Sequence, residues 1–187
     1  MSELLHELPL RSAHARPSAP ALVYKGRVFD YGWLADQIER CAAALVRLGL
    51  GKLERVGVYL PKQPENVVGM FGAPRAGMVF VPINPLLKPM QVGHILRDCN
   101  VRVLITSPER ATSLAAELAQ CPDLRHLVIV GGGDFEASAP NIRVHRWDAL
   151  LDSKPRERLH RVIDADVVSI FYTSGSTGKP KGVVLSH

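Results

Sequence analysis

The chain has 187 residues, and its 47% hydrophobic and 22% charged residues are typical of a folded α/β protein and exclude a disordered one. One domain with a buried core is the simplest arrangement at this length. The net charge is +5, but the lysines and arginines are interleaved with acidic residues and form no basic run, which argues against a nucleic-acid partner.

The cysteines and the N-terminus bear on the location of the protein. Cys41, Cys99 and Cys121 are odd in number and widely spaced, with no C-x-x-C pair, so they predict buried thiols and neither a disulfide framework nor a zinc site. Residues 1–10 lack the cationic start and long apolar stretch of a secretory signal, and no window reaches the length of a membrane span. We therefore expect a cytoplasmic protein, and its oligomeric state stays open.

Helical and strand-like segments alternate along the chain. Helical patterns lie near 33–48, 64–76, 89–98 and 109–120, and apolar strand-like runs lie at 56–60, 79–83, 101–105, 126–130 and 167–172. Such alternation predicts an α/β fold with βαβ units, a largely parallel sheet and flanking helices. Because ligands bind at the carboxyl ends of strands in open parallel sheets, the segment after residue 172 is placed to form a site.

Two connecting segments lack these patterns. Residues 131–147 begin with three glycines that do not have G-x-G-x-x-G spacing, so they predict a loop and connector and no dinucleotide site. Residues 152–161 are rich in lysine and arginine and predict a solvated link.

The segment from Tyr172 to Gly182 combines hydroxyl groups, glycines and lysines at the end of the last predicted strand. Its glycines can take positive φ and let a ligand approach the backbone, whose N–H groups can form a nest for an anion. Hydroxyl and ammonium donors can follow phosphate oxygens and offset their charge. The sequence therefore predicts a polyphosphate site made of Thr173, Ser174, Gly175, Ser176, Thr177, Gly178, Lys179 and Lys181.

Two other glycine-containing motifs fail on spacing. A Walker A loop requires Ser or Thr after its lysine and then a helix, whereas Pro180 follows Lys179 and the apolar run at 183–185 predicts a second strand. A nucleophile elbow requires a glycine two residues before its serine, and neither Ser174 nor Ser176 has one. The remaining alternative is a surface loop without a ligand, which is the common fate of such a composition.

The whole string at 172–182 resembles the phosphate-binding signature of the AMP-forming, adenylate-forming enzymes, which include acyl-CoA synthetases, adenylation domains of peptide synthetases and luciferases. The likeness covers the chain from about Pro17 onward. Residues 21–24 and 29–34 are similar to the family's opening strand pair and first helix, 55–61 to its next core strand, and 73–85 to a helix end, a strand and a Pro-rich loop. Residues 84–105 look most like acyl-CoA ligases.

The resemblance implies a fold, a reaction and cofactors. Residues 17–187 would be the first part of the large N-terminal domain of the adenylate-forming fold, with 1–16 as an N-terminal extension. With ATP and Mg²⁺, a carboxylic acid, expected to be a fatty or other acyl acid, would join the α-phosphate of ATP with release of pyrophosphate, and the acyl group would then pass to coenzyme A. The β- and γ-phosphates would be held by Thr173, Ser174, Ser176, Thr177 and Lys181.

The later motifs of the family have no match in this chain. They bind adenine and ribose, complete the magnesium site and supply the catalytic lysine of a small C-terminal domain, so we expect the catalytic lysine beyond His187 and no metal ligand within the chain. On this interpretation the fragment is inactive alone. The alternative is a non-catalytic remnant or an interaction module that keeps the fold.

Three further groups are weighed as site residues. Asp164 and Asp166 precede the last predicted strand, on the side away from the loop, so they predict a solvated strand entry and no magnesium site. His94 and Asp98 lie one helical turn apart and predict a surface pair, not a catalytic dyad. His187 follows the loop as it does in many members of the family, and a structural role is equally compatible with it.

Overall fold

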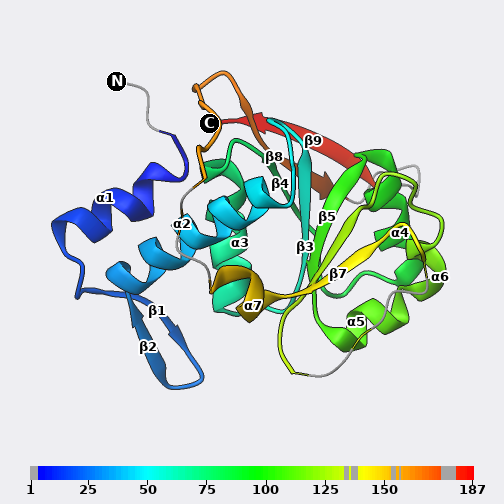
Figure 1. Ribbon diagram of the computed structural model, residues 1–187, viewed down its shortest axis with the longest axis horizontal. Helices are drawn as coiled ribbons and strands as arrows, with labels where there is room; N and C mark the ends of the chain where they lie inside the picture. Colours follow the sequence, from blue (N-terminus) through cyan, green and yellow to red (C-terminus); the bar gives the residue numbers. More distant parts are fainter. Residues whose placement is uncertain (1–3, 133–134, 136–138, 153–154, 156, 174–179) are drawn as a thin grey trace.

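The structure is a computed structural model that describes residues 4–132, 135, 139–152, 155, 157–173 and 180–187 (Figure 1). Its helices are α1 (Glu7–Ala15), α2 (Tyr31–Arg47), α3 (Pro64–Arg75), α4 (Pro89–Asp98), α5 (Pro108–Ser113), α6 (Ala115–Leu118) and α7 (Trp147–Leu151). Its strands are β1 (Pro20–Tyr24), β2 (Arg27–Asp30), β3 (Arg55–Tyr59), β4 (Val79–Pro82), β5 (Val101–Thr106), β6 (His126–Ile129), β7 (Arg143–Arg146), β8 (Val167–Thr173) and β9 (Lys181–Ser186).

One sheet organises most of the described chain. Its strand order is β7-β6-β5-β3-β4-β8-β9, and every neighbouring pair from β7 to β8 is parallel. The last strand, β9, pairs antiparallel with β8. The predicted α/β fold with a largely parallel sheet and flanking helices is therefore confirmed, and β1 and β2 form the expected opening pair as a separate two-stranded sheet.

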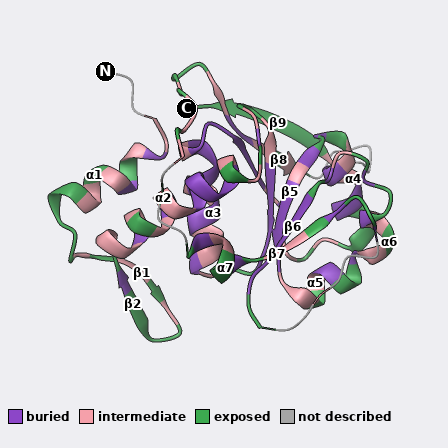
Figure 2. Cartoon of the chain, in the orientation of Figure 1, coloured by how far each residue is buried: buried purple, intermediate pink, exposed green. Residues whose placement is uncertain are grey.

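Each face of the large sheet carries its own hydrophobic core (Figure 2). Along β3, Val56 and Val58 belong to the cluster shared with α2 and α3, whereas Tyr59 belongs to the cluster shared with α4, α5 and α6. Successive side chains of a strand point to opposite faces, so a strand covered on both faces must be apolar throughout. This explains why the core strands are continuous apolar runs in the sequence.

Local signals set where the helices begin. Asp30 caps α2, because its Oδ1 accepts a hydrogen bond of 2.7 Å from the backbone N–H of Trp33. Pro89 occupies the first turn of α4, where a missing N–H costs nothing. The Gln91 Oε1 then accepts a hydrogen bond of 3.0 Å from the backbone N–H of Lys88, which fixes the start of this helix.

The structure differs from the sequence-based expectation in three places. Residues 131–147 were expected to be a loop and connector, but 143–146 form β7 and residue 147 begins α7. Both elements are too short to show a reliable hydrophobic period. The β7 strand consists of two arginines, a histidine and only one aliphatic residue, Val144. The predicted helix at 109–120 is divided into α5 and α6. The segment 1–16 contains a helix, α1, that packs against α2 and that the sequence patterns did not indicate.

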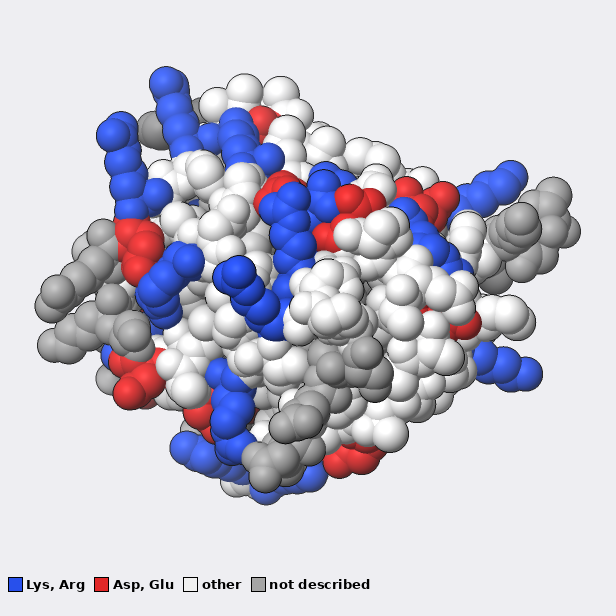
Figure 3. All heavy atoms as spheres, turned by 45° about the vertical axis from the view of Figure 1, so that its right-hand side comes forward, with Lys and Arg blue, Asp and Glu red and all other residues white. Residues whose placement is uncertain are grey.

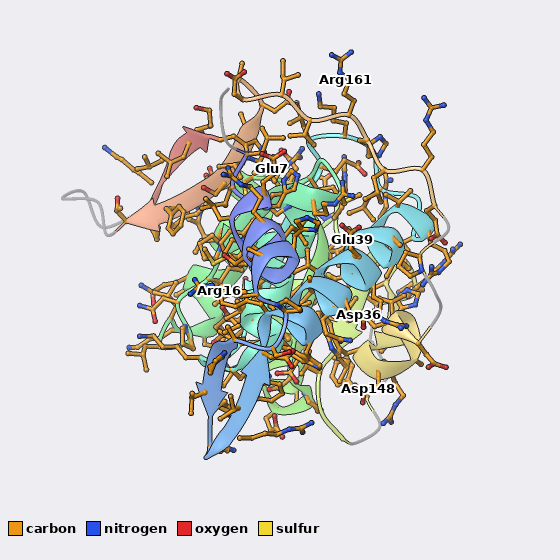
Figure 4. The ribbon with its side chains drawn as sticks, turned by 90° about the vertical axis from the view of Figure 1, so that its left-hand side faces the viewer. Glu7, Arg16, Asp36, Glu39, Asp148 and Arg161 are labelled. Atoms are coloured by element: carbon orange, nitrogen blue, oxygen red, sulfur yellow. The ribbon has the colours of Figure 1, made fainter. Side chains whose placement is uncertain are left out.

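The cysteines and the charged residues match their predictions. All three cysteines are buried thiols, and burial raises the pKa of Cys41 to about 12. Lysines and arginines are scattered among acidic residues on the face in Figure 3. In Figure 4, Asp36 and Glu39 lie on α2, where they form ion pairs with Arg40 at 2.7 Å and with Arg75 at 2.8 Å. None of the helices in the described part of the chain has the length and apolar character needed to cross a membrane.

The β9 strand is the least protected part of the sheet. All its residues are exposed, including the apolar side chains of Val183, Val184 and Leu185. Phe171 on the neighbouring strand β8 is also 40% exposed. An edge strand with exposed apolar side chains is a surface that further protein normally covers.

We predict that Gly72→Ala destabilises the contact between α2 and α3. A Cβ at Gly72 would lie 2.7 Å from Sγ and 2.8 Å from Cβ of Cys41, and rotation of the Cys41 side chain cannot move its Cβ. The helices must therefore separate, and we expect the free energy of unfolding to fall by about 1–3 kcal/mol in urea denaturation. Gly51→Ala is the control, because a Cβ at Gly51 would have nothing within 4 Å. Equal losses in the two variants would contradict the prediction.

We also predict that acid destabilises the protein through His6. This side chain is only 4% exposed, its Nδ1 has no hydrogen-bond partner among the residues that the structure describes, and burial together with the nearby positive charge of Arg75 lowers its pKa from 6.5 to about 4. Between these two pKa values, His6 is protonated in the unfolded chain and neutral in the folded chain. Stability is therefore lost as the pH falls from about 6.5 to about 4. Between pH 7 and pH 5 we expect His6 to account for a loss of up to about 2 kcal/mol.

Urea denaturation of His6→Leu at both pH values measures this contribution, with His14→Leu as the exposed control on the same helix. The fall should be smaller in His6→Leu and unchanged in the control. It should not vanish, because burial also lowers the pKa of His126 and of His145, whose Nδ1 and Nε2 atoms lie 3.0 Å apart. An identical fall in both variants would show that His6 is not responsible.

Candidate functional site

The predicted phosphate loop joins the two strands of the β8–β9 hairpin. The last register pair before the loop is Thr173 with Lys181, and Tyr172 pairs with Gly182 behind it. The parallel pairing of Phe80 on β4 with Ser169 on β8 directs the end of β8 toward the carboxyl edge of the sheet. The loop therefore emerges at the edge where ligands of open parallel sheets bind, as predicted.

Most of the predicted loop residues lie outside the described part of the chain. These are Ser174, Gly175, Ser176, Thr177, Gly178 and Lys179, and their proposed contacts stay predictions. The described neighbours still settle one question. A strand, β9, follows where a Walker A loop would open a helix, so the expectation that a second strand follows the glycine-rich segment is confirmed.

The two described residues of the predicted site flank the loop. Thr173 and Lys181 are both exposed, and they lie directly opposite each other in the hairpin ladder. No other described residue forms an ion pair with Lys181, although Lys52 and several arginines are paired. Its ammonium group is thus available to an anion, and the Thr173 hydroxyl is a donor beside it.

A cavity of about 400 Å³ lies next to the two ends of the loop. Pro82 and Asn84 line it from the end of β4, Gln91 and Ile95 from α4, and Tyr172, Thr173 and Pro180 from the hairpin. The cavity is therefore open space at the carboxyl ends of two adjacent parallel strands, β4 and β8.

His94 and Asp98 take partners that the sequence did not reveal. We expected a surface pair, but Asp98 Oδ2 accepts a hydrogen bond of 2.5 Å from the Tyr172 hydroxyl, and His94 Nε2 lies 3.3 Å from the carbonyl oxygen of Pro180. Burial, followed by the hydrogen bond to Asp98, raises the pKa of Tyr172, so its hydroxyl keeps the proton that it donates. Helical spacing placed both side chains on one face of α4, but these partners are 74 and 86 residues away.

Two of the other residues considered as site residues, Asp166 and His187, have structural partners. Asp166 forms an ion pair of 2.7 Å with Lys52, accepts a hydrogen bond from the Ile163 N–H, and has its pKa lowered mainly by Lys52. It lies before β8, at the end of the strand away from the loop, as predicted. His187 Nδ1 accepts a hydrogen bond of 3.0 Å from the backbone N–H of Leu5.

The described residues offer no site for a metal ion. Within this part of the chain, no three His, Cys, Asp or Glu side chains are grouped closely enough to hold one.

Comparison with known proteins finds similar sequences over nearly the whole chain. The profile of the AMP-binding enzyme family matches residues 10–187. The fatty acid–[acyl-carrier-protein] ligase ScoC of Streptomyces coeruleorubidus is 36% identical over 94% of this chain and 32% of its own length. A feruloyl-CoA synthase of an Amycolatopsis species is 34% identical over 96% of this chain and 32% of its own length.

A solved structure shows that the fold is shared as well. The anthranilate CoA ligase AuaEII in complex with anthranoyl-AMP superposes with a TM-score of 0.87 and 29% identity, over 97% of this chain and 34% of that one. The chain thus spans about a third of the length of each of these three relatives. With its sheet topology, its loop and this match of residues 10–187, the chain belongs to the AMP-binding enzyme family.

Proposed function

We propose that this chain carries the phosphate-binding part of an enzyme that activates a carboxylic acid with ATP as an acyl-adenylate and releases pyrophosphate. The observation that carries the proposal is the β8–β9 hairpin, in which Thr173 lines an open cavity at the carboxyl edge of the sheet and its register partner Lys181 follows Pro180, another residue of that lining. Membership of the AMP-binding enzyme family supports the assignment of a nucleotide to this edge.

The proposed chemistry is mainly electrostatic. A carboxylate that attacks a negatively charged phosphorus needs neutralisation of charge and alignment with the leaving group. Lys181 would offset the charge on the departing pyrophosphate, and Thr173 would donate a hydrogen bond to one of its oxygens. Further donors would come from the loop residues predicted from the sequence, Ser174, Gly175, Ser176, Thr177, Gly178 and Lys179.

The proposal extends to a magnesium ion, the acid substrate and the thiol acceptor. A bound Mg²⁺ ion would add further neutralisation of phosphate charge, but the described residues supply no ligand set for it, and it takes no part in the steps above. We propose a fatty or other acyl acid as substrate and coenzyme A as the acceptor that forms the thioester. The names of the relatives support both coenzyme A and a carrier protein as acceptors in the family. A cytoplasmic location stays a prediction.

We also propose that residues 17–187 form the front part of a large N-terminal domain, with 1–16 as an extension, and that catalysis belongs to a longer enzyme. Two observations support a longer enzyme. The chain spans only 32% of the length of two curated relatives, and β9 leaves apolar side chains uncovered at the sheet edge. The alternative, a non-catalytic remnant or interaction module, shares the fold but would not bind ATP at the hairpin.

We predict that Lys181→Ala weakens ATP use without unfolding the protein. Lys181 is exposed and has no ion pair with another described residue, so its loss removes charge from the site and no packing from the core. Loss of one hydrogen bond to a charged group corresponds to about a 10- to 100-fold weaker interaction. ATP–pyrophosphate exchange by the full-length parent enzyme measures the effect, and urea denaturation checks the fold.

Lys25→Ala is the matched control, because Lys25 is exposed in the distant turn between β1 and β2. It should leave exchange unchanged. Exchange that is equally fast in both variants would refute the role of Lys181, and a parent enzyme that neither binds ATP nor exchanges pyrophosphate would favour the non-catalytic alternative.

A further inference from the structure

We propose that α4 positions the phosphate-binding loop, and that Asp98 and His94 are the positioning residues. This inference rests on the proposed function, because it concerns the loop assigned above to the phosphates. Asp98 is hydrogen-bonded to Tyr172, one residue before the described start of the site at Thr173, and His94 contacts Pro180, one residue before Lys181. One helix therefore holds the chain on both sides of the loop, as Figure 1 shows by the place of α4 beside the hairpin end.

The helix is itself firmly anchored. Val92, Ile95 and Leu96 are at most 1% exposed within the core on this side of the sheet. On its outer side, Arg97 forms an ion pair of 2.9 Å with Glu117 of α6. Because interiors are close-packed and do not deform easily, these contacts make α4 a fixed support from which side chains can reach the hairpin.

The contact at the first end of the loop is strong. A hydroxyl-to-carboxylate hydrogen bond of 2.5 Å is short and charge-assisted, and such bonds are about twice as strong as neutral ones. The pairing of Tyr172 with Gly182 makes room for it. A Cβ at Gly182 would lie 2.9 Å from Ile170 Cγ2 and 3.3 Å from Tyr172 Cζ, so the absence of a side chain lets the Tyr172 ring lie over the neighbouring strand.

The contact at the second end of the loop involves Pro180, a residue that can form few hydrogen bonds. Pro180 has no backbone N–H, so it cannot donate to the hairpin ladder, and its carbonyl oxygen is its only polar group. His94 Nε2 lies 3.3 Å from that oxygen. His94 and Asp98 are four residues apart and lie on the same face of α4, so one face of this helix contacts both chain segments.

The functional consequence is preorganisation. A loop whose two ends are fixed loses less conformational freedom when phosphate orders it, so the ligand binds more tightly for the same contacts. Asp98 and His94 touch the loop ends and are not assigned any contact with the ligand.

The test uses Tyr172→Phe, which removes the hydroxyl and keeps the charge of Asp98, together with Asp98→Ala and the conservative Asp98→Asn, whose amide oxygen can still accept the bond. Asp148→Ala, at an exposed carboxylate on α7, is the control. Amide hydrogen exchange of the peptide at 172–182 reports the order of the loop ends in this chain. Titration with ATP reports affinity in the full-length parent enzyme, and thermal denaturation reports the fold.

We expect Tyr172→Phe and Asp98→Ala to speed exchange in this peptide and to weaken ATP binding by about fivefold to tenfold, which corresponds to one lost hydrogen bond. Asp98→Asn should recover part of both effects, and the control should show neither. Unchanged exchange in Tyr172→Phe and Asp98→Ala overturns the proposal, as does unchanged affinity while Lys181→Ala still weakens binding. Faster exchange in a parent enzyme that binds no ATP overturns the proposed function and the ligand role of α4 together, but leaves the contact itself established.

Discussion

Burial of the parallel sheet on both faces is the constraint on which the other features depend. The cluster containing Val58 covers one face and the cluster containing Tyr59 covers the other, so no ligand can reach the middle of the sheet. Over the strands between these two clusters, the strand ends are the accessible part. At the carboxyl ends of β4 and β8 the structure has a cavity of about 400 Å³ and the two ends of the predicted phosphate loop. The position of the candidate site thus follows from the way in which the core is built.

The antiparallel pairing of β8 with β9 determines which side chains point to each side of the hairpin at this edge. Strand side chains alternate between faces, so Tyr172 and the Thr173–Lys181 pair point to opposite sides of the hairpin. Ile170 and Tyr172 pack against the cluster that contains α4, while Phe171 meets Phe80 of the other cluster at 6.3 Å between ring centroids. The side of the hairpin that carries Ile170 and Tyr172 is therefore attached to the layer that contains α4, and Thr173 follows at the strand end, in the lining of the cavity.

The sequence predicted what depends on regular periods and on local composition. The core strands are continuous apolar runs because both faces are buried. The loop was predicted from its hydroxyl groups, glycines and lysines and from its position after a predicted strand. The sequence could not predict β7, which has one aliphatic residue, Val144, nor the partners of Asp98 and His94. Those contacts join segments more than 70 residues apart, and they depend on where α4 packs after the sheet has formed. No local pattern carries that information.

The exposed β9 edge can be understood in the same terms. Its inner neighbour β8 is held by parallel pairing with β4, but β9 has β8 as its only partner in the described sheet, and Val183, Val184 and Leu185 remain exposed. The Tyr172–Asp98 hydrogen bond adds a contact from the helical layer at the loop end of this hairpin. On the proposal made above, the placement of Lys181 at the carboxyl edge would depend on side-chain contacts with α4 as well as on the backbone ladder.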